Sequence, residues 1–201
     1  MTVTVTATSL KLVLKWAQRT LFTTAILTLG YSAFVLVDAR LFQKRENRRL
    51  ELLLATQRAE QRPESVPAIG PDGLIGRIEV PRLGFSAVLF EGTDSTTLRR
   101  AAGHVEGTAL PGQRGNMGIA GHRDRFFRPL RNIQQNDVIT LTTLVGEYRY
   151  RVVSTKIVSP EDVGVLDSDG AEILTLVTCY PFYFVGAAPN RFIVRAKRVT
   201  G

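Results

Sequence analysis

Short runs of β-forming residues follow one another from Leu74 to the C-terminus, and in two of them apolar residues (Tyr148, Tyr150 and Val152; Phe192, Val194 and Ala196) alternate with polar or charged ones. Such runs, when turn residues separate them at short intervals, are typical of β-strands in a single barrel or sandwich. The runs are Leu74–Val80, Ala87–Phe90, Asn116–Ala120, Val138–Thr142, Glu147–Val153, Ile173–Cys179 and Arg191–Lys197. The one helix that this region predicts covers Phe126–Ile133. We therefore expect a mainly β domain.

An uncharged apolar segment, residues 20–37 (TLFTTAILTLGYSAFVLV), lies near the N-terminus. Its eighteen residues reach the lower limit for a helix that spans a bilayer. Lys11, Lys15 and Arg19 precede it, and Trp16 stands where an aromatic side chain would anchor a helix at the membrane interface. We expect an uncleaved transmembrane anchor over 20–37, preceded by a cytoplasmic N-terminal segment over residues 1–19.

Two other interpretations of this segment stay open. A cleaved signal peptide needs small residues at its cleavage site, and Asp38-Ala39-Arg40 fits that pattern poorly. A buried helix of a soluble protein is disfavoured by the four threonines and by basic residues at both ends. The orientation is open as well, because three Lys or Arg residues precede the span and five follow it within 40–49. On that count alone, the C-terminal domain would face the cytoplasm.

Residues 38–73 are expected to form a stalk and a linker. Within 39–62, charges of both signs, several leucines and the lack of Gly and Pro predict a helix that emerges from the membrane. Three prolines and two glycines within 63–73 predict a linker and a domain boundary.

The net charge of +8 is uneven, with +6 in residues 1–62 and +2 in residues 63–201. A nucleic-acid binder would concentrate its basic residues on the folded domain, so this class is disfavoured. Basic residues that flank an apolar segment suit an anionic membrane surface instead.

Cys179 is the only cysteine, and it closes the apolar run that begins at Ile173. One thiol excludes an internal disulfide and a metal site made of cysteines. The end of a strand, just before the turn marked by Pro181, is a place where a fold presents a reactive side chain to solvent. The other interpretation is a buried cysteine that packs as a small apolar side chain.

His104 and His122 are the only histidines, and His122 closes the predicted strand Asn116–Ala120. Two strand ends at one rim of a barrel can bring this imidazole to Cys179 across 57 residues of sequence. An imidazole can then protonate a leaving amine and deprotonate an incoming nucleophile. Arg191 opens the last predicted strand and can donate to an oxyanion or hold a substrate backbone. A surface histidine and a solvated arginine are the alternatives.

Together these residues resemble the sortase family. TLVTC at residues 175–179 is similar to the TLxTC signature of that family, in which the catalytic cysteine comes last. Gly121-His122 at the end of an earlier strand and Arg191 near the start of the last one agree with it. Residues 103–112 (GHVEGTALPG) look like the first histidine-containing loop of many members, those of class D in particular. The resemblance covers residues 74–199.

The resemblance implies a closed β-barrel of about eight strands with short helices. It also implies a cysteine transpeptidase anchored in the cytoplasmic membrane, with its catalytic domain outside the cytoplasm. Cys179 would attack the carbonyl after threonine in an LPxTG-like sorting signal, and an amine would resolve the thioacyl-enzyme. His122 would act as general acid and then as general base. Arg191 would stabilise the oxyanion or position the substrate.

Three further residues are secondary candidates on the same resemblance. His104 and Thr178 would contribute to substrate binding, and Arg123 is a second candidate for the cationic role. The implied partners are secreted proteins that carry a C-terminal sorting signal, an amine acceptor of the cell envelope and the lipid bilayer. No nucleic-acid partner is expected.

No cofactor is required by this chemistry. Four carboxylates within Glu161–Asp169 could ligate Ca²⁺, as in some sortases, although a solvated turn explains them more simply. Two other functions stay open. One is a cysteine peptidase that hydrolyses the same signal, and the other is a non-catalytic anchored barrel that binds a partner.

Overall fold

The computed structural model describes residues 7–60, 68–70, 72–184 and 186–199, and within the first range it describes the side chains of 14–56. The chain divides into two compact units, Met1–Leu41 and Phe42–Gly201. The expected N-terminal segment over 1–19 and the expected linker over 63–73 lie partly outside the described residues, and both stay predictions.

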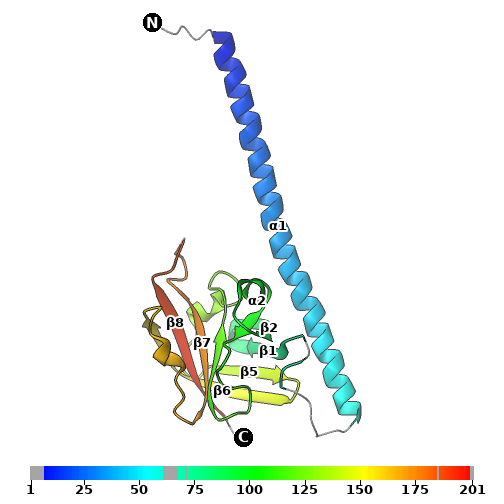
Figure 1. Ribbon diagram of the computed structural model, residues 1–201, viewed down its shortest axis with the longest axis vertical. Coiled ribbons are helices and arrows are strands. Elements are labelled where there is room, and N and C mark those ends of the chain that lie inside the picture. Colours follow the sequence, from blue (N-terminus) through cyan, green and yellow to red (C-terminus); the bar gives the residue numbers. More distant parts are fainter. Residues whose placement is uncertain (1–6, 61–67, 71, 185, 200–201) are drawn as a thin grey trace. The chain divides into compact units, whose positions relative to one another are not determined.

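One continuous helix, α1 (Ala7–Glu60), contains the expected membrane span (Figure 1). Within the described residues it is the one helix that is long and apolar enough to cross a bilayer, and none of its apolar window is buried in protein. The hydroxyls of Thr24 and Thr28 each donate to a carbonyl one turn earlier, at 2.8 Å. A helix whose polar groups are satisfied internally is suited to a bilayer, so α1 can act as a membrane anchor.

The expected closed barrel of eight strands is confirmed. Every strand except the three-residue β3 contains one of the runs that the sequence predicts. In chain order the strands are β1 (Leu74–Val80), β2 (Phe85–Glu91), β3 (Ala102–His104), β4 (Gly115–Ala120), β5 (Val138–Thr143), β6 (Gly146–Val158), β7 (Glu172–Tyr180) and β8 (Asn190–Arg198).

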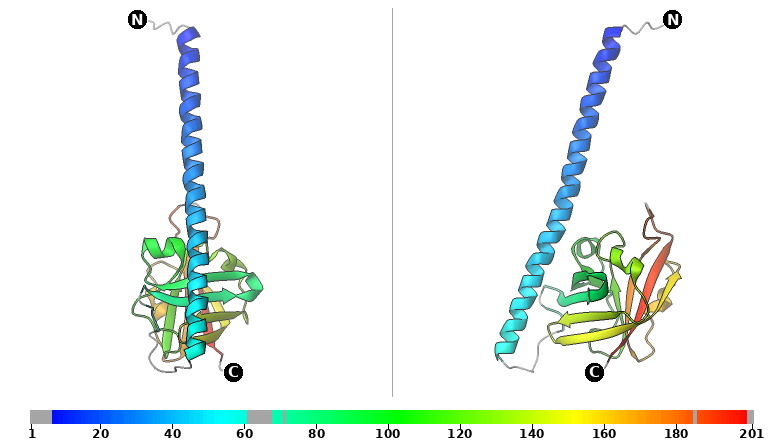
Figure 2. Two further views of the ribbon diagram at one scale, coloured as in Figure 1. Left: turned by 90° about the vertical axis from the view of Figure 1, so that its right-hand side faces the viewer. Right: turned by 180° about the vertical axis from the view of Figure 1, so that it is seen from behind.

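The strands follow the spatial order β1-β2-β3-β4-β7-β8-β6-β5, and β5 pairs with β1 to close the barrel. The β2–β3 and β4–β7 pairs are parallel, and the others are antiparallel. Figure 2 shows β7 and β8, in orange and red, side by side. This order places β7, which carries Cys179, between β4 and β8.

Alternate side chains fill the interior of the barrel. Met117 and Ile119 of β4 and Leu174 and Leu176 of β7 are buried in one core with Phe127, which follows β4. Because successive side chains of a strand point to opposite faces, the residues between these core positions face outward. Cys179, two residues beyond Val177 on β7, and its cross-strand partner Arg191 lie on this outer face.

The part of α1 beyond the boundary between the two units packs on the barrel. Leu50 is fully buried against Leu74 and Leu144. The Gln43 side chain donates to the Arg100 carbonyl at 2.6 Å and accepts an N–H of β2 at 3.0 Å. The latter part of the expected stalk is therefore a packed element of the barrel unit.

The short helices differ from the prediction. The helix expected over Phe126–Ile133 is reduced to the 3-10 helix η2 (Arg128–Asn132). Phe127 and Leu130 are both fully buried, and their spacing of three residues suits the threefold period of a 3-10 helix. The other short helices are η1 (Pro81–Leu83), α2 (Ser95–Arg100) and η3 (Val163–Leu166).

Candidate active site

Cys179 and Arg191 are direct partners across the antiparallel pair β7–β8. Directly opposed residues have Cβ atoms about 4.5–5.5 Å apart. Val177 and Ile193 form the next pair on the same face, while Thr178 between them is buried. The half-buried thiol and the half-buried guanidinium therefore start from neighbouring positions on the outer face of the barrel.

His122 follows β4 at the same rim. The parallel pairing of β4 with β7 ends at Val177, and Gly121 extends it with two further bonds. The Gly121 N–H donates to the Val177 carbonyl at 3.2 Å, and the Gly121 carbonyl accepts from Thr178 Oγ1 at 2.7 Å. His122 comes next, so this register carries it to the level of Cys179. The structure thus brings together the strand ends that bear all three sequence-predicted catalytic residues.

The corner at Gly121 requires a residue without a side chain. A Cβ atom there would lie 2.8 Å from the ring of Phe127. The His122 carbonyl in turn accepts the N–H groups of Arg125 and Phe127, at 3.3 and 3.2 Å. Core packing and backbone hydrogen bonds therefore fix the segment that carries the imidazole.

Thr178 has a positioning role in this geometry. Its side chain is buried, and its single hydroxyl hydrogen is donated to the Gly121 carbonyl. Thr178 thus ties the segment that leads into His122 to the strand of Cys179. A direct part for Thr178 in substrate binding stays a prediction.

His104, the last residue of β3, is only 2% exposed. Its Nδ1 lies 2.8 Å from Glu91 Oε2, and its Nε2 lies 3.0 Å from the Ala109 carbonyl and 2.9 Å from the Thr108 hydroxyl. Protein groups thus occupy both ring nitrogens. His104 joins β2 to the segment between β3 and β4, and its expected contact with substrate stays a prediction.

The Arg191 guanidinium is held by backbone carbonyls. Its Nη1 donates to the carbonyls of Ala188 and Asn190, at 3.3 and 3.1 Å. The pKa of Glu161 is lowered, chiefly because the Ser159 hydroxyl hydrogen-bonds to its carboxylate and also because Arg191 attracts it. A guanidinium has five N–H donors, so Arg191 has donors left for a substrate oxygen.

Apolar side chains line the outer face of β4 and β7 as it approaches Cys179. A Cβ atom at Gly118 would lie 2.9 Å from Leu166 and 3.1 Å from Val105, so these two side chains close over the glycine. Half-buried Ala120 and Val177 form the next pair along the two strands. An extended peptide with an apolar residue upstream of its reactive carbonyl would find apolar contacts here.

Among the described residues, no group of three or more His, Cys, Asp and Glu side chains could hold a metal ion. In the acidic segment Glu161–Asp169, Asp162 lies 3.9 Å from Lys156 Nζ, and Asp169 lies 3.2 Å from Arg195 Nη2. These carboxylates have cationic neighbours, and a calcium site in this segment stays a prediction without support from geometry.

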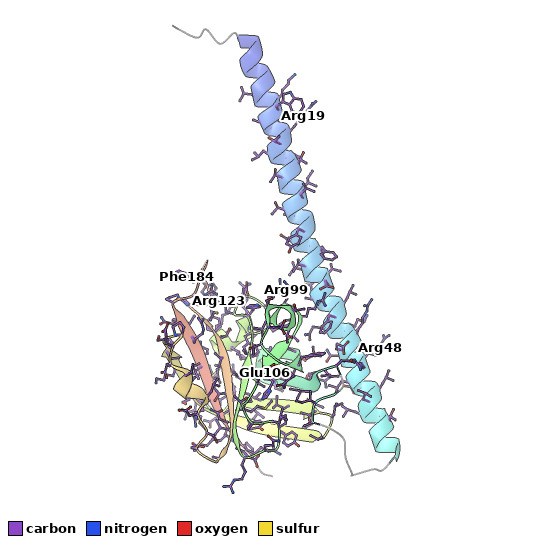
Figure 3. All side chains as sticks on the ribbon, in the orientation of Figure 1. Arg19, Arg48, Arg99, Glu106, Arg123 and Phe184 are labelled. Atoms are coloured by element: carbon purple, nitrogen blue, oxygen red, sulfur yellow. The ribbon has the colours of Figure 1, made fainter. Side chains whose placement is uncertain are left out.

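Arg123, directly after His122, binds the chain segment between β7 and β8 rather than a carboxylate. Its Nη2 donates to the carbonyls of Phe184 and Gly186. Figure 3 labels Arg123 and Phe184 close to each other at the end of the barrel. The sequence gives no signal for this contact, because a carbonyl acceptor is present at every position of a chain.

Comparisons with known proteins agree with this fold. The family model described as the Sortase domain matches residues 78–199. Sortase D of Bacillus subtilis is 32% identical over 183 residues, which cover 85% of this chain and 91% of that protein. Sortase A of Listeria monocytogenes is 32% identical over 112 residues, which cover 54% of this chain and 50% of that protein.

A solved structure of a Clostridium perfringens Sortase D5 transpeptidase superposes with a TM-score of 0.64 at 28% identity. The match covers 79% of this chain and 99% of that chain. Sortase C1 of Streptococcus agalactiae gives a TM-score of 0.62 at 32% identity, over 69% of this chain and 74% of that chain. The chain belongs to the sortase family and is a sortase-type cysteine transpeptidase. Sortases act on surface proteins that carry sorting signals.

Proposed function

We propose that this sortase cleaves an LPxTG-like signal after threonine and transfers the cleaved protein to an amine of the cell envelope. One observation carries the proposal: Cys179 is paired with Arg191, beside the Gly121–His122 corner that is bonded to the end of β7. This arrangement supports a nucleophile, an oxyanion donor and a proton carrier at one rim.

The first half of the reaction forms a thioester. The Cys179 thiolate attacks the threonine carbonyl carbon, and the carbonyl electron pair moves to oxygen. Arg191 donates hydrogen bonds to that oxyanion. When the intermediate collapses, the bond to the glycine nitrogen breaks, and His122 gives its proton to the leaving amine.

In the second half of the reaction, the acyl group passes from the Cys179 sulfur to the nitrogen of the amine. The incoming amine attacks the thioester carbonyl and passes a proton to His122, which restores the imidazolium. The carbon–sulfur bond then breaks, and the thiolate is regenerated. One amide bond replaces another, so the reaction requires no oxidant or reductant.

The proposal extends to the location of the enzyme. We expect α1 to anchor the protein in the cytoplasmic membrane with the barrel on the outer side, where secreted proteins and envelope amines occur. The single thiol supplies a direct test. A membrane-impermeant maleimide should label Cys179 in intact cells as fully as it does after lysis. Labelling that requires lysis would contradict this orientation.

The activity is tested with a fluorescent peptide that contains an LPxTG sequence, incubated with the full chain with and without a small primary amine. We expect a peptide–amine conjugate, and we expect Cys179→Ala to abolish it and His122→Ala and Arg191→Ala each to reduce it strongly. Cleavage that is unaffected by the amine and yields no conjugate would identify a peptidase. Unchanged turnover in Cys179→Ala would refute the proposed nucleophile.

A further inference from the structure

The β7–β8 loop, residues 181–189, joins the strand of Cys179 to the strand of Arg191. It exposes two aromatic side chains, because Tyr183 is 73% and Phe184 46% accessible to solvent. Phe182, near the start of the loop, packs against the barrel core and the Phe192 ring. The exposed residues Tyr183 and Phe184 lack such packing, and segments with few buried apolar contacts open easily unless other groups hold them. The position of this exposed part therefore depends on contacts from elsewhere in the barrel.

Two arginines from the other side of the rim supply such contacts. Arg123 Nη2 donates to the Phe184 carbonyl at 2.7 Å and to the Gly186 carbonyl at 2.9 Å. Its guanidinium carbon also lies 5.8 Å from the centre of the Phe184 ring. Arg131 of η2 adds a second contact, from Nη1 to the Tyr183 hydroxyl at 2.7 Å. Of the two arginines, Arg123 donates to backbone carbonyls of the loop, whereas Arg131 donates to a side chain.

The same loop also holds the Arg191 guanidinium. Arg191 Nη1 donates to the carbonyls of Ala188 and Asn190, at 3.3 and 3.1 Å. Hydrogen bonds therefore run from Arg123 to the loop and from Arg191 back to the same loop. A displacement of the loop would move the Ala188 carbonyl, which is one of the two acceptors that orient Arg191; the other acceptor, the Asn190 carbonyl, belongs to the first residue of β8.

We propose that Arg123 is a positioning residue that clamps the β7–β8 loop to the end of β4 and thereby sets the position of the Arg191 guanidinium beside Cys179. The expected effect on catalysis rests on the proposed function, whereas the expected hold of Arg123 on the loop does not. In this role Arg123 affects the reacting atoms only through Arg191 and does not contact them.

The contacts favour a clamp over a general contribution to stability. Among the ion pairs that the structure describes, none includes Arg123, so its charge is not used to neutralise a carboxylate. Both hydrogen bonds come from one nitrogen and reach carbonyls two residues apart in one loop. Because one nitrogen makes both bonds, a lysine ammonium at this position, which carries three N–H donors, can replace part of this contact.

The experiment compares the full chain in detergent micelles with Arg123→Ala, Arg123→Lys, Arg191→Ala and the double variant Arg123→Ala/Arg191→Ala. Arg125→Ala is the matched control, because Arg125 lies in the same segment and donates to the Arg99 carbonyl at 2.9 Å. Two quantities are measured. One is hydrogen–deuterium exchange of peptides that cover the β7–β8 loop, and the other is kcat/KM for the LPxTG-containing peptide.

In Arg123→Ala we expect loop amides to exchange about tenfold faster and kcat/KM to fall about tenfold or more. Arg123→Lys should recover part of both effects, and Arg125→Ala should leave exchange in the loop unchanged. The decisive result is the double variant, whose kcat/KM should equal that of Arg191→Ala alone, because a residue that acts only through Arg191 has no effect without it.

Two results would overturn the clamp. One is unchanged exchange of the loop in Arg123→Ala, and the other is a double variant in which the two losses multiply. If Arg123→Ala does not fold, loop exchange and kcat/KM are compared in Arg123→Lys and Phe184→Ala instead. If the wild-type chain cleaves no such peptide, the proposed function fails, while the exchange measurement still decides whether Arg123 holds the loop.

Discussion

Replacing Leu50 with alanine tests whether the last third of α1 is part of the folded barrel unit. Leu50 is fully buried in a small cluster with Leu74 and Leu144. Buried Leu→Ala changes cost about 2–5 kcal/mol, and a surface helix that can shift toward the cavity places this one near the lower end, at about 2.5 kcal/mol. For a folded unit of this size, that loss lowers the Tm by about 5–10 °C.

The assay is calorimetric unfolding of the full chain in detergent. Leu52→Ala is the matched control, because Leu52 lies on the same helix and is 63% exposed. Exposed substitutions usually change stability by less than about 0.5 kcal/mol, so this control should shift the Tm by about 2 °C or less. Equal shifts for the two variants, or no shift for Leu50→Ala, would refute the packing of this segment on the barrel.

Three further predictions concern the barrel and its rim. Asp137 is buried, and the Arg82 guanidinium that hydrogen-bonds to it holds the pKa of the carboxyl below its ordinary value. A lowered pKa stabilises the fold above the ordinary carboxyl pKa and loses this effect as the pH falls. Asp137→Asn should therefore lower the Tm by a few degrees at pH 7, and by less near pH 3. A Tm difference between Asp137→Asn and the wild-type chain that is the same at both pH values would contradict this stabilisation by the Asp137 carboxylate. Gly121→Ala should reduce peptide turnover about tenfold or more while thiol alkylation persists, because its Cβ would meet the Phe127 ring 2.8 Å away and the His122 segment must move. Turnover of Gly121→Ala at the wild-type level would show that the corner at Gly121 can accept a side chain. Turnover in 5 mM CaCl₂ or in EDTA should agree within about twofold, because carboxylates of the 161–169 segment have cationic neighbours instead of converging on one point. A strong calcium dependence would point to a rearranged segment.

The barrel was predictable because strand alternation is a local signal. The runs Leu74–Val80 and Val138–Thr142 match β1 and β5 to within one residue, since each contains apolar residues at a two-residue period between turn residues. The three residues of β3 and the six of α2 are too short to show a period. A prediction from periodicity alone therefore misses them.

The candidate site was likewise predictable in part. Cys179 and Arg191 close and open consecutive strands, so their pairing follows from a simple antiparallel hairpin. The clamp from Arg123 and the double contact of Gln43 were not predictable, because both involve backbone groups that no residue type marks. The docking of α1 depends on Leu50, whose sequence context is the same as that of its exposed neighbours.

The most direct test of the central claim is the mass of the enzyme after it reacts with a sorting peptide in the absence of amine. The account predicts an added mass equal to the peptide fragment that ends at threonine, localised to Cys179 by tandem mass spectrometry. Addition of a primary amine should remove that mass and yield the conjugate. An adduct on another residue, or peptide cleavage by Cys179→Ala, would contradict the account.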